Sequence, residues 1–509
     1  MKKQIKYFIL LVFLAAGFNS CKKDEGEVKP NQAPETAFAI EAINLDGDNR
    51  LNSLVKLTWY GSDPDGFVKG YEISLDNINW TYTTSQDSTF RFTINSGSDT
   101  ADIEVYVRAI DNLDLADPSP DFIRIPVKNT PPKVEFDADL TIPDTAFLVG
   151  TTAWSASDLD GLETITNVYL SINGKSWFEL NKTKRTISLV PSNSNASDTT
   201  NAFIYYDNDQ NPNSQQVEGL VVNGMNTLYI KAVDQAGTES KIDTAASFYL
   251  KGKQNEILVV SGLGGNAKTI YNNTLNTIGI TYDELDLIVN SGLYRPKLWN
   301  ITFRLQLSFY NKLFFYSNET SFQNSYTNLS ALLLEFAAAS LQQFANSGGK
   351  YFITTNFDHN QNIDGFVGVL PISSVSNKNY GSARLYANDS IVVPFIITPA
   401  DTIISGTDTT ITPADTTRAN NLPNLAAQNT TVGVGVYNID PLDTEVLYTA
   451  NVVDRRPTIP WPDTKIIASG RRVNGKLNQV YFGMQVWKLY KNPADLETLF
   501  DQIFNVEFN

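Results

Sequence analysis

One stretch of this chain occurs twice, and that repetition constrains the fold more than any other feature of the sequence. Residues 59–66 (WYGSDPDG) and 154–161 (WSASDLDG) share the pattern W-x-x-S-D-x-D-G. Downstream of each copy lies a similar segment that ends in tryptophan, YEISLDNINW at Trp80 and VYLSINGKSW at Trp177. A third pair, VRAID and IKAVD, follows in the same order. Three ordered matches predict an internal duplication of one structural unit.

Segments of the first copy have the two-residue period of β-strands. LVKLTWY, GYEISLD, FRFTI, IEVYVRAI and FIRIPV alternate apolar and polar residues, and Asp, Gly, Asn and Pro separate them. Several short strands at this spacing predict a β-sandwich, with the tryptophan of each motif packed between the sheets. The two units resemble fibronectin type III or bacterial immunoglobulin-like modules over residues 34–130 and 131–252, with a hinge at Thr130-Pro131-Pro132. The polar run PSNSNASDTTN in the second unit predicts a loop.

Near residue 255 the pattern changes to alternating strands and helices. ILVVSGLGGNAKTIYNNTLNTIGI predicts a buried strand, a glycine turn and a helix. LSALLLEFAAASLQQFANSGGKYFITT predicts a long helix, a stop at Gly348-Gly349 and a further strand. This alternation is typical of a parallel sheet with helices on both faces. The expected fold class is therefore two all-β sandwich modules followed by an α/β domain with a mainly parallel sheet over residues 253–509.

This C-terminal region resembles the flavodoxin-like core of class I glutamine amidotransferase-like domains through its ILVV start, its helix-GGKYFITT segment and its strand-helix finish. The resemblance implies a nucleophilic cysteine after the strand that ends at Thr355, but the chain continues there as NFDHN. Cys21 is the only cysteine in 509 residues, so cysteine-based amide chemistry is excluded. Members of the fold without the nucleophile serve in binding or structure, and we expect the same here. A Thr/Asp-rich insertion over 396–430 predicts an exposed loop.

The amino terminus has the parts of an export signal. A basic segment (MKKQIK) precedes the apolar run YFILLVFLAA, which is shorter than the about 20 residues that span a bilayer. Small residues then lead to Cys21, where a lipoprotein signal peptidase would cut. We therefore predict a signal peptide over 1–20, a lipid on Cys21 that anchors the protein to a membrane, and a tether over 21–33. The alternative is a secreted protein with a chance cysteine at the cleavage site.

The tether begins KKDEGE directly after the cysteine. This segment resembles the lysine-plus-acidic export signal that sends lipoproteins of the Bacteroidetes to the outer face of the outer membrane. The resemblance implies an outer-membrane location, lipid-anchored and facing the cell exterior. A solvated charged tether without that role is the alternative.

Charge excludes one large class of function. The formal net charge is −16, and it becomes −19 once Lys2, Lys3 and Lys6 are removed with the leader. Nucleic-acid binding requires clustered basic residues, so no nucleic acid is expected as a partner.

The chain also has a single histidine, His359, and a Ser-His-Asp triad would have to use it.

The turn after the first strand of the C-terminal region is one candidate ligand site. Residues 262–269 read GLGGNAKT, which fits G-x-G-x-x-A and nearly fits a phosphate-binding loop, with Ala267 where a glycine belongs. Gly262, Gly264 and Gly265 are its candidate ligand-binding residues. The alternative is a tight strand-to-helix turn, and an exported protein meets little nucleotide.

Asn356, Asp358 and His359 form a second candidate site. They follow a predicted central strand, at the carboxyl end where open α/β sheets bind ligands. His359 is the one candidate catalytic residue, with Asp358 beside it and Ser317 at the end of the adjacent predicted strand. A polar loop is the alternative. A glycosidase needs only two carboxylates, and no particular pair stands out here.

The Asp-rich turns of the repeat could hold Ca²⁺ through hard oxygen ligands. The candidate ligands are Asp63 and Asp65 in the first copy and Asp158 and Asp160 in the second. None of these turns, nor Asp46-Gly47-Asp48, continues into an EF-hand loop. We expect structural β-turns and no catalytic cofactor, with structural Ca²⁺ as the one metal that these turns could take.

These features predict a modular surface lipoprotein in which two sandwich spacers hold a catalytically silent domain away from the membrane. The expected role is extracellular recognition of a polysaccharide or an envelope partner. Two alternatives stay open. One is an extracellular hydrolase that acts on glycans or esters through the C-terminal domain, and the other is a purely structural envelope component.

Overall fold

The structure is a computed structural model that describes most of the chain after residue 28. The described residues are 29–40, 50–95, 97–195, 198–288, 295–317, 321–323, 330–355, 365–375, 383–385, 391–394, 422–432, 434–450, 452–454 and 465–509. They form two compact units, the first ending at Thr130 and including Asp158–Thr164, and the second comprising Pro131–Ser157 and Ile165–Asn509. The predicted leader, Cys21 and most of the predicted tether lie outside the described residues.

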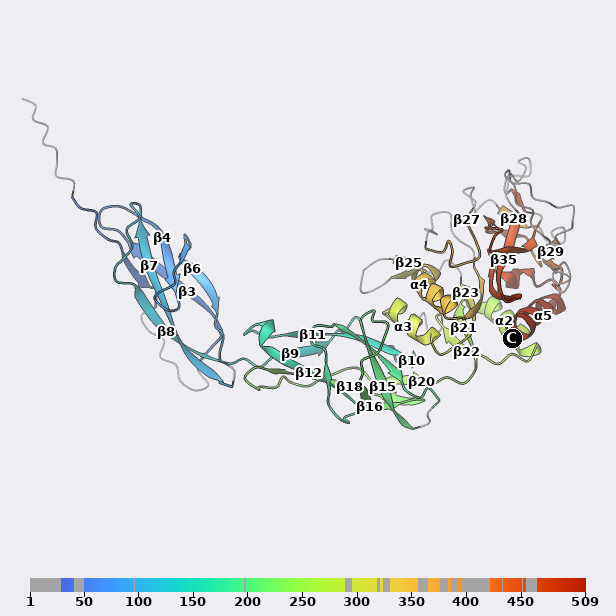
Figure 1. Cartoon of the computed structure of the whole chain (residues 1–509), viewed down its shortest axis with the longest axis horizontal. Coiled ribbons are helices and arrows are strands. Elements are labelled where there is room, and N and C mark those ends of the chain that lie inside the picture. The colour runs from blue at the N-terminus through green and yellow to red at the C-terminus, as the bar shows by residue number, and fades with distance from the viewer. Residues whose placement is uncertain are drawn as a thin grey trace, which may run out of the picture. The chain divides into compact units, whose positions relative to one another are not determined.

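The first unit is a β-sandwich of a three-stranded and a five-stranded sheet (Figure 1), with strand orders β1-β3-β6 and β2-β8-β7-β4-β5. In β3, Val55, Leu57 and Trp59 are buried while their neighbours point to solvent, so one face of the strand lines the core. The sandwich-like β structure predicted from the alternating pattern is confirmed. The strands are β1 Glu35–Phe38, β2 Leu51–Asn52, β3 Leu54–Ser62, β4 Val68–Ser74, β5 Thr81–Thr83, β6 Asp87–Arg91, β7 Thr100–Asp111 and β8 Asp121–Lys128.

The second copy of the repeat is again built from strands, in sheets of order β16-β15-β14-β11-β9, β13-β12-β18-β19 and β10-β20-β17. The polar run predicted as a loop connects β14 to β15, which pair as a hairpin, and its last residues already belong to β15. The strands are β9 Lys133–Phe136, β10 Thr145–Phe147, β11 Gly150–Ser157, β12 Ile165–Ile172, β13 Phe178–Leu180, β14 Thr186–Pro191, β15 Thr199–Tyr206, β16 Gln216–Val221, β17 Gly224–Asn226, β18 Leu228–Asp234, β19 Asp243–Thr244 and β20 Phe248–Lys251. A 3₁₀ turn, η2, spans Leu162–Thr164.

The two motif tryptophans occupy equivalent core positions with different polar surroundings. Trp59 and Trp154 are 1% and 2% exposed and belong to the hydrophobic clusters of their sandwiches, which confirms the predicted packing of both. The indole Nε1 of Trp59 donates to the Ser85 carbonyl at 3.1 Å. The indole Nε1 of Trp154 has no hydrogen-bond partner among the described residues, and the Arg185 guanidinium lies 5.2 Å from its ring centre.

Nine strands form one mixed sheet in the C-terminal part of the second unit, in the order β22-β21-β23-β26-β36-β35-β33-β29-β30. The pairs from β22 to β36 are parallel, and those from β36 to β30 are antiparallel. The strands of this sheet are β21 Ile257–Gly262, β22 Asp283–Asp286, β23 Lys312–Ser317, β26 Lys350–Thr354, β29 Ile391–Pro394, β30 Leu425–Ala426, β33 Glu445–Thr449, β35 Ile466–Val473 and β36 Lys476–Phe482. Short strands lie outside it: β24 Ser321–Gln323, β25 Ser330–Leu332, β27 Ser374–Val375, β28 Ala383–Leu385, β31 Thr431–Val432, β32 Tyr437–Asn438 and β34 Val453–Asp454.

Helices cover both faces of this sheet (Figure 1), and strand β21 shows why. Ile257 and Val259 belong to the hydrophobic cluster of α2 and α5, whereas Leu258 and Val260 belong to that of α3 and α4. The four consecutive apolar residues of this strand are thus buried on both sides of the sheet. The helices are α2 Gly265–Thr277, α3 Trp299–Leu307, α4 Leu333–Asn346 and α5 Pro493–Asp501, with a 3₁₀ turn η6 at Val486–Leu489 and a π-helical turn η7 at Gln502–Glu507. No helix in the described part of the chain is both long and apolar enough to cross a bilayer.

Candidate functional site

The carboxyl ends of the parallel strands form the first candidate site. Strand β21 pairs in parallel with β22 on one side and β23 on the other, so the strand order reverses direction there. Sheets of this kind bind ligands in the crevice outside such a reversal. Gly262 ends β21 opposite Ser317, and a Cβ on Gly262 would lie 2.6 Å from the Ser317 Cβ. Gly262 is therefore required by the close approach of β23.

Gly264 and Gly265 leave the start of helix α2 uncovered. Gly264 is the N-cap and provides no side-chain cap, and Gly265 has φ +60°, a conformation that favours glycine. Among the described residues, a Cβ on Gly265 would meet nothing within 4 Å, and one on Gly264 would meet only Ile288, at 3.6 Å. The first turn of α2 borders a cavity of about 180 Å³, whose lining residues are Leu263, Gly264, Asn266, Ala267, Gln485, Trp487 and Lys488.

The opposite wall of this cavity is the segment after β36, which side chains of the sheet and of α2 hold in place. The Thr354 hydroxyl donates to the Met484 carbonyl at 2.7 Å and accepts from the Val486 N–H at 3.0 Å. The Tyr271 hydroxyl accepts from the Trp487 N–H at 3.1 Å. Burial raises the pKa of Tyr271 well above its ordinary value, so the hydroxyl stays neutral at physiological pH.

Two polar groups of this wall have no hydrogen-bond partner among the described residues. Gln485 is 4% exposed, and its Nε2 donates to the Ser317 carbonyl, while its Oε1 accepts nothing. The buried indole Nε1 of Trp487 likewise donates to nothing. The sequence predicted neither residue, because about 220 positions separate them from the glycine turn that they face.

Lys268 occupies the position that a phosphate-binding lysine would have. Its ammonium forms ion pairs with Glu284 at 2.8 Å and Asp286 at 2.5 Å, both from strand β22. Burial opposes the charge of Lys268, but the two carboxylates outweigh burial and raise the pKa of Lys268. The lysine therefore links α2 to β22 and has two anionic partners already.

Asn356, Asp358 and His359 lie outside the described residues, so their predicted roles stay predictions. The residue before them, Thr355, is buried at the same edge of the sheet. Its hydroxyl accepts from the Ser317 hydroxyl at 3.5 Å.

The Asp-rich turns of the repeat bind the backbone that leads into each copy. Asp65 accepts from the N–H of Gln32 at 3.2 Å, and Asp160 accepts from the N–H of Thr130 at 2.8 Å. The hydroxyl of Ser53 donates to the other oxygen of Asp160. These partners give the second aspartate of each motif a structural role.

The first aspartates of the motif differ between the copies. The Asp158 carboxylate accepts from the Asp160 N–H and the Thr164 hydroxyl, both at 2.9 Å. Asp63 accepts from the Asp65 N–H at 3.3 Å through Oδ1, and its Oδ2 has no hydrogen-bond partner among the described residues. Within the described ranges, no three His, Cys, Asp or Glu side chains gather in a metal-binding group.

A groove on the first unit is a site that the sequence did not predict. It measures about 620 Å³, within the ~300–1,000 Å³ of typical ligand pockets. Strands β5 and β6 are the edges of their respective sheets, so the groove lies where the sandwich is open. Its lining residues are Ile73, Ser74, Leu75, Asp76, Asn79, Thr81, Tyr82, Thr83, Ser88 and Phe90.

Tyr82 is held rigidly in this groove. A Cβ on Gly70 would lie 2.4–2.6 Å from the hydroxyl and ring atoms of Tyr82, so the ring rests on the glycine backbone. The Tyr82 hydroxyl donates to the Lys69 carbonyl at 3.2 Å. The residue is nevertheless 47% exposed, which leaves an aromatic surface fixed in position and open to solvent.

The turn at Asp76–Asn79 supplies polar groups beside this ring. The carboxylate of Asp76 accepts from the N–H groups of Asn79 and Ile78 at 2.7 and 2.8 Å, and from the Asn79 amide and the Ser74 hydroxyl. The Asn79 backbone and side chain, followed by Ile78 and Ser74, lower the pKa of Asp76 well below its usual range. The turn is therefore anionic and ordered.

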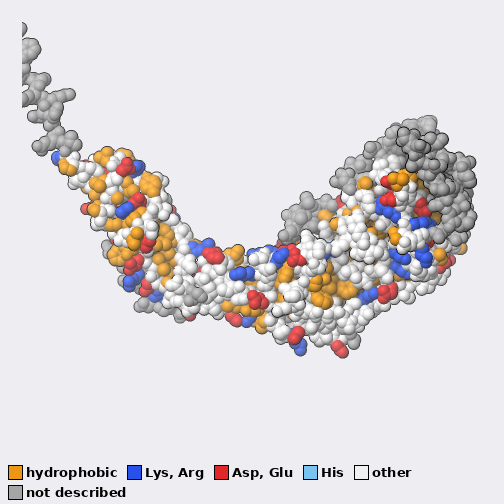
Figure 2. All heavy atoms as spheres, in the orientation of Figure 1, with side chains coloured by type: hydrophobic (Ala, Val, Ile, Leu, Met, Phe, Trp, Pro, Cys, Tyr) orange, Lys and Arg blue, Asp and Glu red, His pale blue; other side chains and the backbone are white. Residues whose placement is uncertain are grey.

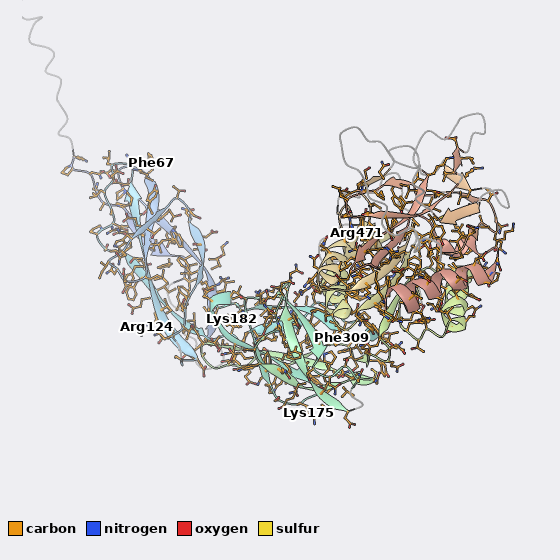
Figure 3. All side chains as sticks on the ribbon, turned by 45° about the vertical axis from the view of Figure 1, so that its right-hand side comes forward. Phe67, Arg124, Lys175, Lys182, Phe309 and Arg471 are labelled. Carbon is orange, nitrogen blue, oxygen red and sulfur yellow. The ribbon has the colours of Figure 1, made fainter. Side chains whose placement is uncertain are left out.

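The surface of the first unit also exposes many large apolar side chains (Figure 2). Phe67, labelled in Figure 3, projects from the turn between β3 and β4 and is 65% exposed. Extended exposed apolar surface is typical of interaction sites. The exposed residues are Ile40, Leu54, Tyr60, Phe67, Leu75, Ile78, Tyr82, Leu113, Leu115, Phe122, Leu159 and Leu162.

Comparisons with known proteins give structural likenesses only. No protein-family model matches the chain. No curated protein matches it either. The fibronectin(III)-like modules of Clostridium thermocellum CbhA align with 43% of this chain and 94% of their own, at 13% identity and a TM-score of 0.16.

Two further solved structures align with this chain at similarly low sequence identity and TM-score. A GMP synthase protein from Thermoplasma acidophilum aligns with 50% of this chain and 99% of its own, at 8% identity and a TM-score of 0.24. The Bacteroides ovatus mixed-linkage glucan utilization locus protein SGBP-B, solved with a heptasaccharide, aligns with 46% of this chain and 52% of its own, at 8% identity and a TM-score of 0.14. None of these likenesses assigns a function to the chain.

Proposed function

We propose that this protein is a non-catalytic cell-surface lipoprotein that recognises polysaccharide through the groove of its first unit. The observation that carries the proposal is the fixed, exposed ring of Tyr82 in a groove that polar side chains also line.

The chemistry of the groove suits a sugar chain. A sugar ring has an apolar C–H face and a rim of hydroxyl groups, so it is bound best by an aromatic surface beside hydrogen-bonding side chains. Tyr82 and Phe90 provide the aromatic surface, and Asn79 and Thr83 provide amide and hydroxyl groups. Because Gly70 backs the Tyr82 ring, little side-chain freedom is left to lose on binding.

The leader, Cys21 and the KKDEGE segment support display on the outer face of the outer membrane. The strand order β22-β21-β23-β26-β36 corresponds to 2-1-3-4-5 in chain order, and it supports a flavodoxin-like, amidotransferase-like core. The mature chain offers such a core no cysteine nucleophile, which supports a binding role. Structural Ca²⁺ remains a proposal for the Asp63–Asp65 turn, whose Asp63 Oδ2 has no hydrogen-bond partner among the described residues.

The test uses the soluble mature chain from residue 22, incubated with a panel of insoluble polysaccharides. We expect retention on at least one of them, and Tyr82→Ala should reduce the bound fraction at least tenfold. Tyr60→Ala is the matched control, because Tyr60 is 56% exposed in the same unit but does not line the groove. Gly70→Ala should act like Tyr82→Ala, since the new methyl group displaces the ring. Equal retention of the Tyr82 and Tyr60 variants would refute the role of the groove.

A further inference from the structure

The cavity at the start of helix α2 has the features of a second, separate binding site. We propose that it binds the carboxylate of a small hydroxylated acid, such as a uronic acid. The proposal is independent of the groove on the first unit, because all its residues belong to the C-terminal part of the chain.

The first turn of α2 supplies backbone donors for an anion. A helix of 13 residues leaves its first N–H groups without intrahelical acceptors, and the helix dipole adds partial positive charge there. Gly264 places no capping side chain over these groups, and neither glycine has a Cβ to cover them. A carboxylate in the cavity can therefore approach the backbone directly.

The turn η6 adds a side-chain donor and a cationic residue to the wall of the same cavity. The cationic residue is Lys488, which lines the cavity and also makes an interaction of its own within the chain. Trp487 brings a buried indole N–H that donates to nothing in the described part of the chain. Because the Tyr271 hydroxyl accepts from the Trp487 backbone, η6 is fixed against α2, and the two sets of donors keep their relative positions.

The side chain of Gln485 indicates which kind of anion fits the cavity. This residue is 4% exposed and lines the cavity, and its Oε1 has no donor among the described residues. An acceptor beside several donors matches a ligand that carries both a carboxylate and a hydroxyl group. An ionised carboxylate alone has no hydrogen to give to this oxygen, so the hydroxyl group of the ligand is needed.

The size of the cavity and the state of Lys268 limit the ligand further. At about 180 Å³ the cavity is smaller than most drug-sized ligand pockets, which begin near ~300 Å³, so it suits one sugar-acid unit rather than a chain. Lys268, which would hold a nucleotide phosphate, is already paired with Glu284 and Asp286. These carboxylates also disfavour a ligand with more than one negative charge.

The test is calorimetric titration of the mature chain with glucuronate, glucose and inorganic phosphate at neutral pH. We expect glucuronate to bind, glucose to show no measurable heat and phosphate to bind more weakly than glucuronate. Lys488→Met should weaken glucuronate binding at least tenfold, and Trp487→Phe should weaken it severalfold while keeping an aromatic ring packed against the core. Lys491→Met is the control, since Lys491 is exposed and does not line the cavity.

The results of these titrations test the cavity at α2 separately from the groove on the first unit. Equal binding of glucose and glucuronate, tighter binding of phosphate, or an unchanged affinity in Lys488→Met would each overturn the proposal. Thermal unfolding of each variant shows whether it is folded, and Trp487→Phe tests the site if Lys488→Met is not. Tyr82→Ala should leave glucuronate binding unchanged, so failure of the groove and failure of this cavity give different results.

Discussion

The duplicated tryptophans allow a test in which one substitution is made in two equivalent cores. Trp59→Phe and Trp154→Phe remove the same atoms from buried positions, so the losses of volume and apolar contact nearly cancel in the comparison. What differs is the indole N–H, which donates to the Ser85 carbonyl from Trp59 and to no described residue from Trp154.

The expected difference follows from these two N–H groups. Trp59→Phe loses a neutral hydrogen bond, which contributes about 1 kcal/mol. Trp154→Phe removes a buried donor without a partner, which relieves at least ~1 kcal/mol. Trp59→Phe should therefore destabilise its sandwich by about 2 kcal/mol more than Trp154→Phe, a factor of roughly 30 in the opening equilibrium. The Arg185 guanidinium over the Trp154 ring alters this little, because a phenyl ring still faces the cation.

Hydrogen exchange with mass spectrometry is the suitable assay, since a chain of several units does not unfold in one step. The reporters are β7 in the first copy and β18 in the second, because both are central strands of their sheets. Protection of β7 should fall much more in Trp59→Phe than protection of β18 falls in Trp154→Phe. Equal losses, or a larger loss in Trp154→Phe, would refute the reasoning.

Three further outcomes follow from individual contacts. Asp76→Asn should lower the unfolding temperature near pH 7. Because the pKa of Asp76 is depressed in the folded state, the difference in unfolding temperature from wild type should shrink as pH falls below about 4. A melting series at pH 7, 4 and 2.5 measures this. Asp283→Ala removes the acceptor of the Gln254 N–H, the Asn255 amide and the Tyr310 hydroxyl. It should lower the opening free energy of β21–β23, measured by hydrogen exchange, by about 3 kcal/mol, with Asp283→Asn costing less. Gly262→Ala should cost about 1–3 kcal/mol in the same assay, because its Cβ would meet Ser317.

Local pattern predicted the parts of the fold that depend on short stretches of chain. The alternation around Trp59 predicted strand β3 and its buried face, because a strand with one buried face repeats every two residues. Strand β11 around Trp154 is instead buried at five successive positions, Gly150 to Trp154, so only the repeat of the motif predicted it. The β35–β36 hairpin turns at Asn474-Gly475, both with positive φ, and this Asn-Gly pair is a hairpin signal in the sequence that the prediction did not use.

The candidate sites depend on contacts that no local pattern contains. The sequence predicts structural β-turns at the Asp-rich motifs and leaves Ca²⁺ open, and only the structure shows that Asp65 and Asp160 accept from the preceding backbone. The groove needs the register of β4 and β5, which places the Tyr82 ring on Gly70. Likewise, Gln485 lines the same cavity as the glycine turn only because β36 lies beside β26 in the sheet.

The most direct test of the central claim is to incubate the mature chain with polysaccharides and to read retention and released reducing sugar from the same tubes. A recognition protein should be retained without releasing sugar, and Tyr82→Ala should lose retention while Tyr60→Ala keeps it. Release of sugar by the wild-type chain would contradict a non-catalytic role and support the hydrolase alternative. Failure to be retained on any polysaccharide would contradict the recognition role itself.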